Sequence, residues 1–356
     1  MQTLRTDITP GNTADINGKE HLFFSGFSYL GLHTHPLFKE ALKAGIDRYG
    51  TIFISSRIAN VQLSLYDELE HALATALHQQ AAATFSSGYM ASQAAVQYAA
   101  TQGTLLYAPS AHPALWVGKP VIPDTTWHDW AAQTITLINS HPDDTFVIVA
   151  DGVNPLTSTI NDFSWLTQLK RKALVLIDDS HGIGILGPTG NGITHTLPPH
   201  QDYLLAASLA KAYSVQGSVV AGRGAHIAAI KKLPLFTAGT PLMPANAYAF
   251  LQSLSLHDTQ RALLHKQIAY FKIITGDLLN IHNPFLLPMF ILQQSAGIET
   301  QLLEHDIIIS SFRYPSPDSP PINRIVVSAH HTSHQLDILH KLLKNIIIDS
   351  RLGTMD

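Results

Sequence analysis

Six short apolar runs between residues 81 and 222 constrain the fold more than any other feature of the sequence. Amphipathic stretches separate these runs, and each run ends in a small or polar residue. This alternation is typical of β-α-β units, in which strands buried on both faces form a mostly parallel sheet between helices. The sequence therefore predicts an α/β fold. The expected strands are Ala82–Phe85, Thr104–Tyr107, Thr145–Ala150, Ala173–Ile177, Tyr203–Ala207 and Ser218–Ala221.

The length of the chain and a change of pattern near residue 233 predict two domains. The chain has 356 residues, which is more than one compact core usually holds. After Leu233-Pro234 the alternation stops, and a long helical stretch is expected at Pro244–Leu279. Strands punctuated by proline are expected at Phe285–Leu292 and Arg324–Val327. The expected division is an N-terminal segment at 1–60 that packs on both domains, a large domain at 61–233, and interdomain helices with a small α+β domain at 234–356.

The composition narrows the classes of partner and chemistry. With 46% hydrophobic and 13% charged residues the chain is apolar, and a homodimer interface would account for part of this excess. A net charge of -4 provides no basic surface, so neither nucleic acid nor a membrane is expected as a partner. The absence of cysteine excludes thiolate catalysis and disulfides. No signal peptide or membrane span is expected, which makes the cytoplasm the expected location.

Histidines are numerous but do not form a metal-binding pattern. Among the 20 histidines, the close pairs are His33 with His35 and His330 with His331. Both pairs stand in polar, loop-like sequence without a carboxylate at ligand spacing. We therefore expect no metal site.

Two segments at the ends of expected strands carry residues that suit an anion and a heterocycle. Ser86–Met90 opens an alanine-rich helix, and its small residues could let backbone N–H groups bind a phosphate or could act only as a helix cap. At Leu176–Gly184 an apolar strand runs into Asp178, Asp179 and His181. A carboxylate at this place can hold a pyridine nitrogen protonated, or it can simply cap the next turn.

A third segment, Ala206–Tyr213, carries a lysine in an uncharged neighbourhood. Lys211 follows an apolar strand directly, and the next cation along the chain is Arg223. A desolvated amine has a lowered pKa and becomes a competent Schiff-base nucleophile. A surface lysine with a buried stem fits the same pattern. The lysine therefore indicates a Schiff base only in combination with the other two segments.

Taken in order, the three segments resemble the α-oxoamine synthases, a family of pyridoxal-phosphate enzymes of fold type I. The similarity runs from about residue 24 to residue 343 and includes the sequence FSYLGL at Phe27–Leu32. It also includes Ser56-Arg57 and the acidic run at Asp67–Glu70. The resemblance implies a homodimeric acyltransferase with pyridoxal 5'-phosphate as cofactor and with a small amino acid and an acyl thioester as substrates.

The resemblance also assigns the cofactor contacts residue by residue. Lys211 would hold the cofactor as a Schiff base, Asp178 would pair with the pyridine nitrogen, and His181 would bind the phenolic oxygen. His112, in the sequence SAHP, would stack on the ring and complete the catalytic set. The remaining contacts would bind the phosphate, and they are Gly88, Tyr89, Ser208 and, across the dimer interface, Thr240.

On the substrate side the chain departs from the family. Arg324 would bind the substrate carboxylate, and Ser28 stands where the family has an asparagine. The family's Ser-Met-Asp-Gly sequence is replaced by Pro155–Ser158. The loop Thr51–Val61 lacks glycine after Gly50, and its bulky residues are expected to narrow the substrate site or make it more apolar. The alternative is that this loop shifts outward and packs elsewhere.

The sequence is therefore compatible with three functions. The preferred one is a decarboxylative or Claisen-type condensation of an amino acid with an acyl thioester. The second is an aminotransferase of class I or II on the same fold, with Lys211 moving the proton and a keto acid as second substrate. The third is a scaffold that has lost catalysis, against which the presence of Lys211, Asp178 and His181 argues.

Overall fold

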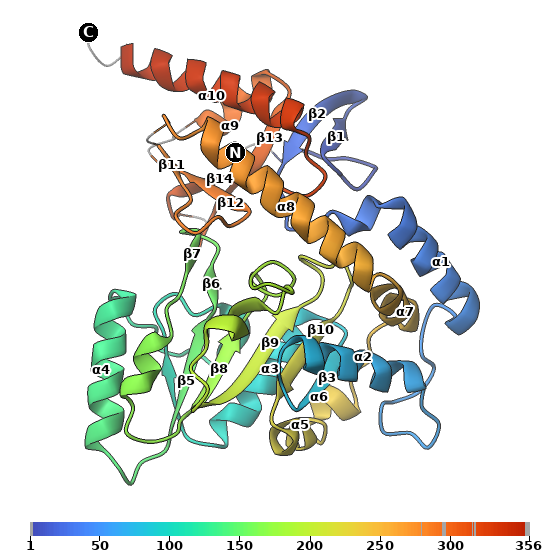
Figure 1. Cartoon of the computed structure of the whole chain (residues 1–356), viewed down its shortest axis with the longest axis vertical. Coiled ribbons are helices and arrows are strands. Elements are labelled where there is room, and N and C mark those ends of the chain that lie inside the picture. The colour runs from blue at the N-terminus through green and yellow to red at the C-terminus, as the bar shows by residue number, and fades with distance from the viewer. Residues whose placement is uncertain (1–2, 279, 294–296, 315, 317, 353–356) are drawn as a thin grey trace. The chain divides into compact units, whose positions relative to one another are not determined.

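The computed structural model describes residues 3–278, 280–293, 297–314, 316 and 318–352, and Figure 1 labels its elements. The chain divides into two compact units. Unit 1 combines Met1–Thr34, Pro155–Thr159 and His257–Asp356, and unit 2 combines His35–Asn154 with Ile160–Leu256. The predicted boundaries at residues 60 and 233 remain a prediction.

Unit 2 is built on one six-stranded sheet with the order β3-β10-β9-β8-β5-β4. The four strands β4, β5, β8 and β9 are parallel, and β10 runs antiparallel to both β9 and β3. All six predicted strands are present within one residue of their expected bounds, and the predicted α/β fold with a mixed, mostly parallel sheet is confirmed. The strands are β3 (Ala81–Phe85), β4 (Thr104–Tyr107), β5 (Phe146–Asp151), β8 (Leu174–Asp178), β9 (Asp202–Ser208) and β10 (Ser218–Gly222).

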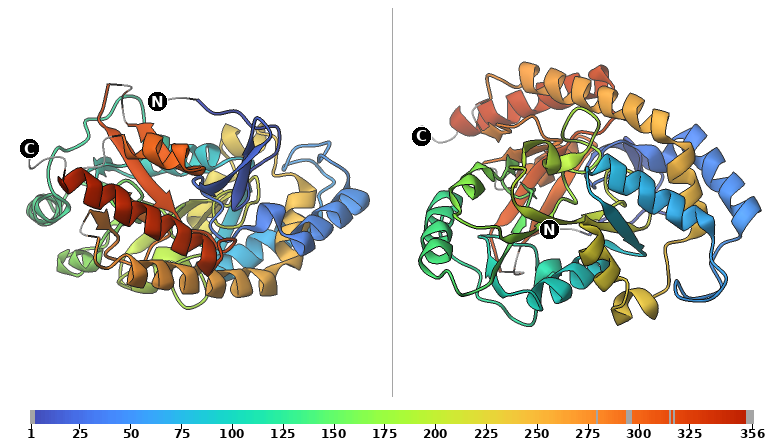
Figure 2. Two further views of the ribbon diagram at one scale, coloured as in Figure 1. Left: turned by 90° about the horizontal axis from the view of Figure 1, so that it is seen from above. Right: turned by 60° about the horizontal axis from the view of Figure 1, so that its bottom comes forward.

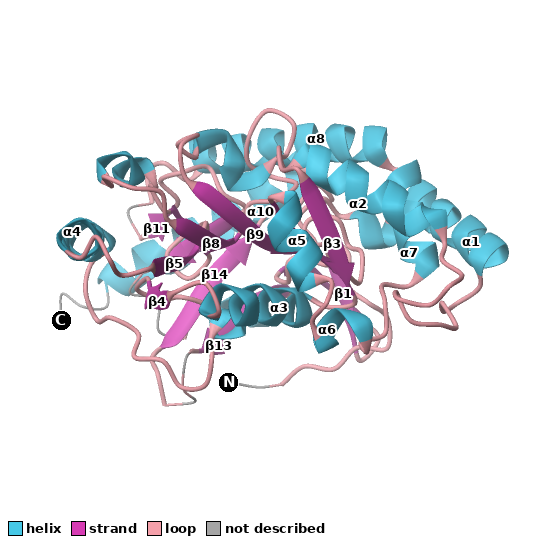
Figure 3. Cartoon of the chain, turned by 90° about the horizontal axis from the view of Figure 1, so that it is seen from below, coloured by secondary structure: helices cyan, strands magenta, loops and turns pink. Residues whose placement is uncertain are grey.

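Helix α3 (Gly88–Ala100) packs on this sheet against β8, β9 and β10 (Figure 3). Its buried face is largely alanine, which lets the helix backbone approach the strands closely. Its first turn therefore lies near the carboxyl end of β9. The other helices of this unit are α1 (Pro36–Tyr49), α2 (Ser64–Ala76), α4 (Trp127–Ser140), α5 (Gly224–Ile230), α6 (Pro234–Thr237) and α7 (Pro244–Gln252), and its 3-10 turns are Pro113–Leu115, Ser164–Gln168 and Gly192–Thr196.

Unit 1 contains a second six-stranded sheet with the order β1-β2-β13-β14-β12-β11, which Figure 2 shows from two further sides. The N-terminal strand β2 pairs in parallel with β13, with Leu22 opposite Ile307. The strand expected at Phe285–Leu292 is shorter than predicted, because only Met289–Leu292 pairs with β14. The strands are β1 (Thr13–Ile16), β2 (Lys19–Phe24), β11 (Ile281–His282), β12 (Met289–Leu292), β13 (Ile307–Arg313) and β14 (Pro321–Val326), and β6 (Val153–Asn154) with β7 (Thr159–Ile160) forms a separate ribbon.

Two long helices, α8 (Leu254–Ile274) and α10 (Ser333–Leu352), belong largely to unit 1, together with α9 (Ile298–Glu304) and the 3-10 turn Leu32–Thr34. The predicted helical stretch Pro244–Leu279 is broken at Ser253 into α7 and α8, and Leu279 lies outside the described residues. No helix in the described part of the chain is long and apolar enough to cross a membrane.

The contact between α1 and α7 gives a test of the packing in unit 2. A Cβ atom at Gly45 would lie 2.9 Å from the Cα atom and the carbonyl oxygen of Ala245, which are backbone atoms that cannot move aside cheaply. We expect Gly45→Ala to lower the free energy of unfolding by about 1–3 kcal/mol. Gly276→Ala is the matched control, since a Cβ there meets only ordinary contacts at 3.4 Å or more. Equal unfolding midpoints in denaturant for the two variants would contradict the close packing.

Candidate active site

Two neighbouring acids at the tip of β8 point to different surroundings. The Asp178 carboxylate accepts a hydrogen bond from Ser92 Oγ on α3, at 3.2 Å, and another from the Ser180 N–H at 2.9 Å. Asp179 instead accepts from the Ile193 N–H at 2.9 Å. Consecutive residues of an extended chain face opposite sides, so only Asp178 lies on the side of the sheet that α3 covers. This geometry favours Asp178 over Asp179 as the acid that faces a ligand.

The predicted lysine and histidine meet at the ends of adjacent strands. Lys211 follows β9 and His181 follows β8, and the distance from Lys211 Nζ to His181 Nε2 is 2.8 Å. His181 is largely buried, and the lysine is half-buried. In the parallel register, Asp178 is paired with Ala206 of β9. The structure therefore brings Lys211, His181 and Asp178 to one edge of the sheet.

His112 lies at the same edge, in the turn after β4. Its backbone N–H donates to Asp151 Oδ2 at 3.0 Å, and its ring Nδ1 accepts from the Ala114 N–H at 3.2 Å. Desolvation lowers the pKa of His112, Asp178 opposes this shift, and the charge of Lys211 adds to it. The surroundings therefore favour a neutral imidazole, which suits a ring that stacks on a planar ligand.

Asp151 is a residue of this site that the sequence reasoning did not find. It ends β5 and is the direct neighbour of Asp178 in the parallel register. Burial raises the pKa of Asp151 well above its usual value, and the charge of Asp178 raises it further. The Asp151 carboxyl holds the backbone of His112 by accepting its N–H. Its position directly after the expected strand Thr145–Ala150 was the available signal, because ligands collect beyond the carboxyl ends of parallel strands.

The first turn of α3 carries the residues predicted to bind a phosphate, Gly88 and Tyr89. Ser87 caps the helix by accepting from the Met90 N–H at 3.3 Å, and the Ser218 hydroxyl fixes the turn by donating to the Ser87 carbonyl at 2.6 Å. The N–H groups of Gly88 and Tyr89 lie in the first turn, where a helix offers no acceptor of its own. A Cβ at Gly88 would lie 3.0 Å from Ser208 Cβ, so the helix start and Ser208 are in close approach.

Thr240 and the loop Thr51–Val61 lie together at the surface of unit 2. Thr240 is exposed and follows α6, and the Ser56 hydroxyl in the loop donates to the Thr237 carbonyl at 2.6 Å. Below them Arg57 is anchored to Glu70 at 3.0 Å. Four apolar side chains of the loop nevertheless face outward in the single chain. These are Ile52 (55% exposed), Ile54 (94%), Ile58 (65%) and Val61 (70%).

In unit 1, Arg324 is a buried cation without an acidic partner in the part of the chain that is described. Its side chain in β14 is 3% exposed, and the rings of Phe27 and Phe312 each lie 4.9 Å from the guanidinium carbon. One Nη atom donates to the Pro155 carbonyl at 3.1 Å, and Nε has no hydrogen-bond partner among the residues that the structure describes. Burial lowers the pKa of Arg324, and an arginine remains charged even so. An anion is the ligand that this group lacks.

Ser28 directly follows Phe27, whose ring contacts Arg324. Its hydroxyl is 2.6 Å from His33 Nδ1, and His33 Nε2 is 2.7 Å from the Pro10 carbonyl oxygen. A carbonyl only accepts, so a neutral His33 carries its proton on Nε2 and receives the Ser28 hydroxyl at Nδ1. Because Phe27 contacts Arg324 directly, Ser28 and Arg324 belong to one region of unit 1.

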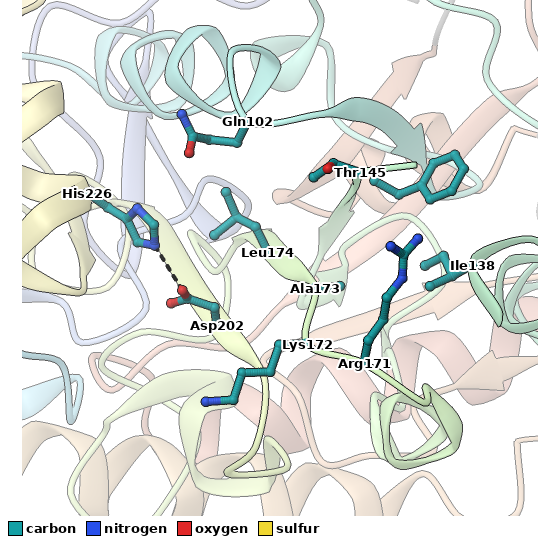
Figure 4. Close-up of a pocket in the computed structure, with 10 residues that line it drawn as sticks. Gln102, Ile138, Thr145, Arg171, Lys172, Ala173, Leu174, Asp202 and His226 are labelled. Atoms are coloured by element: carbon teal, nitrogen blue, oxygen red, sulfur yellow. Dashed lines mark hydrogen bonds and ion pairs between the residues drawn. The ribbon is translucent and has the colours of Figure 1, made fainter. Parts of the chain in front are cut away.

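A separate pocket of about 190 Å³ lies at the opposite edge of the unit 2 sheet, near the amino ends of β5, β8 and β9 (Figure 4). None of the predicted site residues lines it. Within it His226 Nε2 contacts Asp202 Oδ2 at 3.0 Å, and Arg171 donates to the carbonyls of His141 and Pro142. In the described residues no group of three or more histidine or acidic side chains has the arrangement of a metal site.

Known proteins share both the sequence pattern and the fold. No family model matches the chain. An 8-amino-7-oxononanoate synthase of Lysinibacillus sphaericus is 27% identical over 362 residues, which cover 95% of this chain and 92% of that protein. A serine palmitoyltransferase of Bacteriovorax stolpii is 29% identical over 223 residues, or 60% of this chain and 53% of that protein.

A solved serine palmitoyltransferase variant from S. paucimobilis, with a bound pyridoxal-phosphate adduct of myriocin, has a TM-score of 0.83 at 18% identity, covering 96% of this chain and 92% of that one. The chain has the fold-type I architecture. An 8-amino-7-oxononanoate synthase from Francisella tularensis gives a TM-score of 0.69 at 20% identity over 93% of this chain and 99% of that one. The predicted resemblance to the α-oxoamine synthases is confirmed, and the roles of individual fold-type I site residues remain predictions.

The positions of the two acids give a prediction about turnover. Asp178→Asn removes the negative charge that faces the ligand. Its amide oxygen can still accept from the Ser180 N–H, and its amide nitrogen can donate to the Ser92 hydroxyl, which now accepts. We expect turnover to fall by roughly a hundredfold or more, while cofactor binding changes far less. Ser92→Ala is the matched control, and it removes one hydrogen bond worth about 1 kcal/mol. Steady-state rates and a cofactor titration measure both effects, and wild-type turnover in Asp178→Asn would rule out this role for Asp178.

Proposed function

We propose that this protein is a pyridoxal-phosphate-dependent acyltransferase of the α-oxoamine synthase type, which condenses a small amino acid with an acyl thioester. The observation that carries the proposal is the meeting of Lys211, His181 and Asp178 at the carboxyl ends of β8 and β9. Relatives that match over most of the chain are 8-amino-7-oxononanoate synthases. An enzyme of this type is a transferase.

The residues of unit 2 fit pyridoxal 5'-phosphate at each of its polar ends. Lys211 offers an amine for the aldehyde, and the N–H groups of Gly88 and Tyr89 with the Ser208 hydroxyl suit a phosphate. Asp178 is buried and still has acceptor capacity beyond its bonds to Ser92 and Ser180. Pyridoxal phosphate, when bound, supplies an electron sink for negative charge at the α-carbon of an amino acid.

The side chains of the site have separate tasks in this chemistry. Lys211 must lose a proton to act as a nucleophile, and His181 Nε2 is the acceptor at hydrogen-bond distance from its Nζ. The Asp178 carboxylate keeps a proton on the pyridine nitrogen, because its negative charge favours the positive ring. His112, held neutral by its surroundings and fixed through its backbone by Asp151, orients the ring by stacking.

The charge of Arg324 supports an amino acid or another carboxylate as substrate. A buried guanidinium without an acidic partner among the described residues is stabilised by an anion, and a carboxylate matches its forked geometry. The rings of Phe27 and Phe312 hold the guanidinium plane. Ser28 adds a hydroxyl in the same region and would replace the family's asparagine as a substrate contact.

The proposal includes a homodimer in the cytoplasm. Thr240 makes no hydrogen bond within the described residues, which suits a side chain whose partner lies on a second subunit. The outward-facing loop residues Ile52, Ile54, Ile58 and Val61 form an apolar surface beside it. Burial of that surface in a dimer would account for part of the apolar composition of the chain.

The cofactor linkage is tested without an activity assay. Purified protein should be yellow, because a lysine-linked pyridoxal chromophore absorbs in the visible. Borohydride should abolish the band and add the cofactor mass to the peptide that contains Lys211. Lys211→Ala should lack the band while keeping a folded sheet. A colourless protein that cannot be reconstituted with pyridoxal phosphate would sink the proposal.

The loop Thr51–Val61 leads to a prediction about the substrate. We expect weak or no release of CoA from glycine with pimeloyl-CoA, because bulky residues replace the glycines that leave room in the family. CoA release should be measured with glycine, alanine and serine against short and long acyl thioesters. Ile52→Gly with Ile54→Gly should raise the rate with pimeloyl-CoA if the loop narrows the site.

Two outcomes decide against parts of this prediction. Rapid turnover of glycine with pimeloyl-CoA by the wild-type protein would show that the loop does not restrict the site. An amino donor that removes the visible band by itself, with no CoA released from any thioester, would favour the aminotransferase. The first outcome tests the loop directly, because Ile52 and Ile54 are exposed in the single chain and would restrict the site only if they turned toward it.

A further inference from the structure

The carboxyl group of Asp179 lies in a space that three glycines leave open. A Cβ atom at Gly182 or at Gly192 would collide with this carboxyl, and one at Gly152 would lie 3.0 Å from its Oδ1 atom. Gly192 also has a φ of +70°, which side chains rarely adopt. We name these three residues the glycine cage. The cage comes from three separate turns of unit 2, and its members share only the carboxyl that they surround.

Asp179 also closes the loop that carries His181. Its carbonyl accepts from the N–H groups of Gly182 and Ile183 at the start of this loop, at 3.0 and 2.9 Å. Its carboxyl Oδ2 accepts from the Ile193 N–H at the end, at 2.9 Å. One residue therefore ties together the two ends of the segment Ser180–Gly192.

This loop in turn packs against the segment that carries the lysine. A Cβ at Gly184 would lie 2.9 Å from Ala212 Cβ and 3.0 Å from Tyr213 Cζ, so the loop touches the residues that follow Lys211. At the start of the loop His181 contacts Lys211 Nζ at 2.8 Å. A shift of the loop would move both contacts, and the position of the amine would follow.

The groups around the carboxyl are uncharged apart from one acid. The glycine cage and the Ile193 N–H are neutral, and Asp178 is the acidic neighbour. Among the described residues Asp179 Oδ1 has no hydrogen-bond partner. Asp179 is fully buried, and burial raises its pKa well above the usual value. An ionised carboxylate with one unpaired oxygen would be costly in this place, whereas the protonated form carries no charge.

We propose that Asp179 is a positioning residue, whose uncharged carboxyl fills the glycine cage and pins the Ser180–Gly192 loop so that His181 holds the amine of Lys211 in place. The proposal rests on the function proposed above, which assigns the cofactor to Lys211. Asp179 itself touches neither cofactor nor substrate in this arrangement. In this proposal Asp178 supplies the negative charge near the ligand, and Asp179 fixes the position of the loop.

The decisive comparison is between Asp179→Asn and Asp179→Ala. Asparagine keeps the shape and an acceptor for the Ile193 N–H, and it is always neutral. We expect Asp179→Asn to keep the cofactor band and its pH titration. Alanine leaves that buried N–H unpaired, so we expect roughly tenfold weaker binding of pyridoxal phosphate and a shifted titration of the Lys211-linked band.

The pH dependence of unfolding tests the charge independently of the cofactor. An acid whose pKa is raised on folding stabilises the fold at low pH, and this contribution is lost as the pH rises from about 4 through the raised value. Asparagine has no proton to lose. The unfolding midpoint of Asp179→Asn should therefore increase relative to that of the wild type as the pH rises from 5 to 8. If Asp179→Asn is as damaging as Asp179→Ala, or loses stability relative to the wild type with rising pH, the carboxyl acts as an anion and the proposal is overturned.

A second pair of variants tests the positioning role itself. Gly182→Ala should lower cofactor occupancy, because its Cβ collides with the carboxyl, and Asp179→Ala in the same chain should relieve part of this loss. A wild-type band and titration in Asp179→Ala would show that the loop needs no pin. Failure of the wild-type protein to bind pyridoxal phosphate would instead refute the proposed function, and the unfolding comparison would still stand.

Discussion

The parallel register of β5, β8 and β9 is the constraint on which the rest of unit 2 depends. It places Asp151, Asp178 and Ala206 side by side at one edge of the sheet. Since the chain leaves all three strands at that edge, the segments that follow them must converge there. Lys211 and His181 meet at 2.8 Å because their strands are neighbours, although 30 residues separate them in sequence.

The alternation of side chains then divides the roles of two adjacent acids. Asp178 faces α3 and receives its charge-stabilising hydrogen bonds from Ser92 and Ser180. Asp179 faces the other way, into a space lined by glycine. A slip of one residue in the register of β8 would exchange these surroundings and leave a charge in the glycine cage. The fold therefore specifies which acid lies beside α3 and which lies in the space lined by glycine.

The sequence predicted unit 2 well because its signals are local. Short apolar runs between helices identify buried parallel strands, and the six strands lie within one residue of their expected bounds. Strands β1, β2 and β13 were not predicted. The pairing of β2 with β13 joins residues almost a whole chain apart, at Ile307–Ile309, whereas the hairpin of β1 and β2 across Asn17-Gly18 is a local signal that the prediction missed. Asp151 was missed although it directly follows the expected strand Thr145–Ala150, whereas only tertiary contacts bring the rings of Phe27 and Phe312 to Arg324.

The three acids at the carboxyl end of the unit 2 sheet lie close enough together for their charges to repel one another. Asp151, Asp178 and Asp179 are close enough for the charge of Asp178 to raise the pKa of both neighbours, and burial raises it in each case. Three negative charges at this edge would repel one another. The raised pKa of Asp151 and of Asp179 favours the neutral form of each, which reduces this repulsion. Both carboxyls accept hydrogen bonds, Asp151 from the backbone N–H of His112 and Asp179 from the N–H of Ile193 at the end of the loop that carries His181.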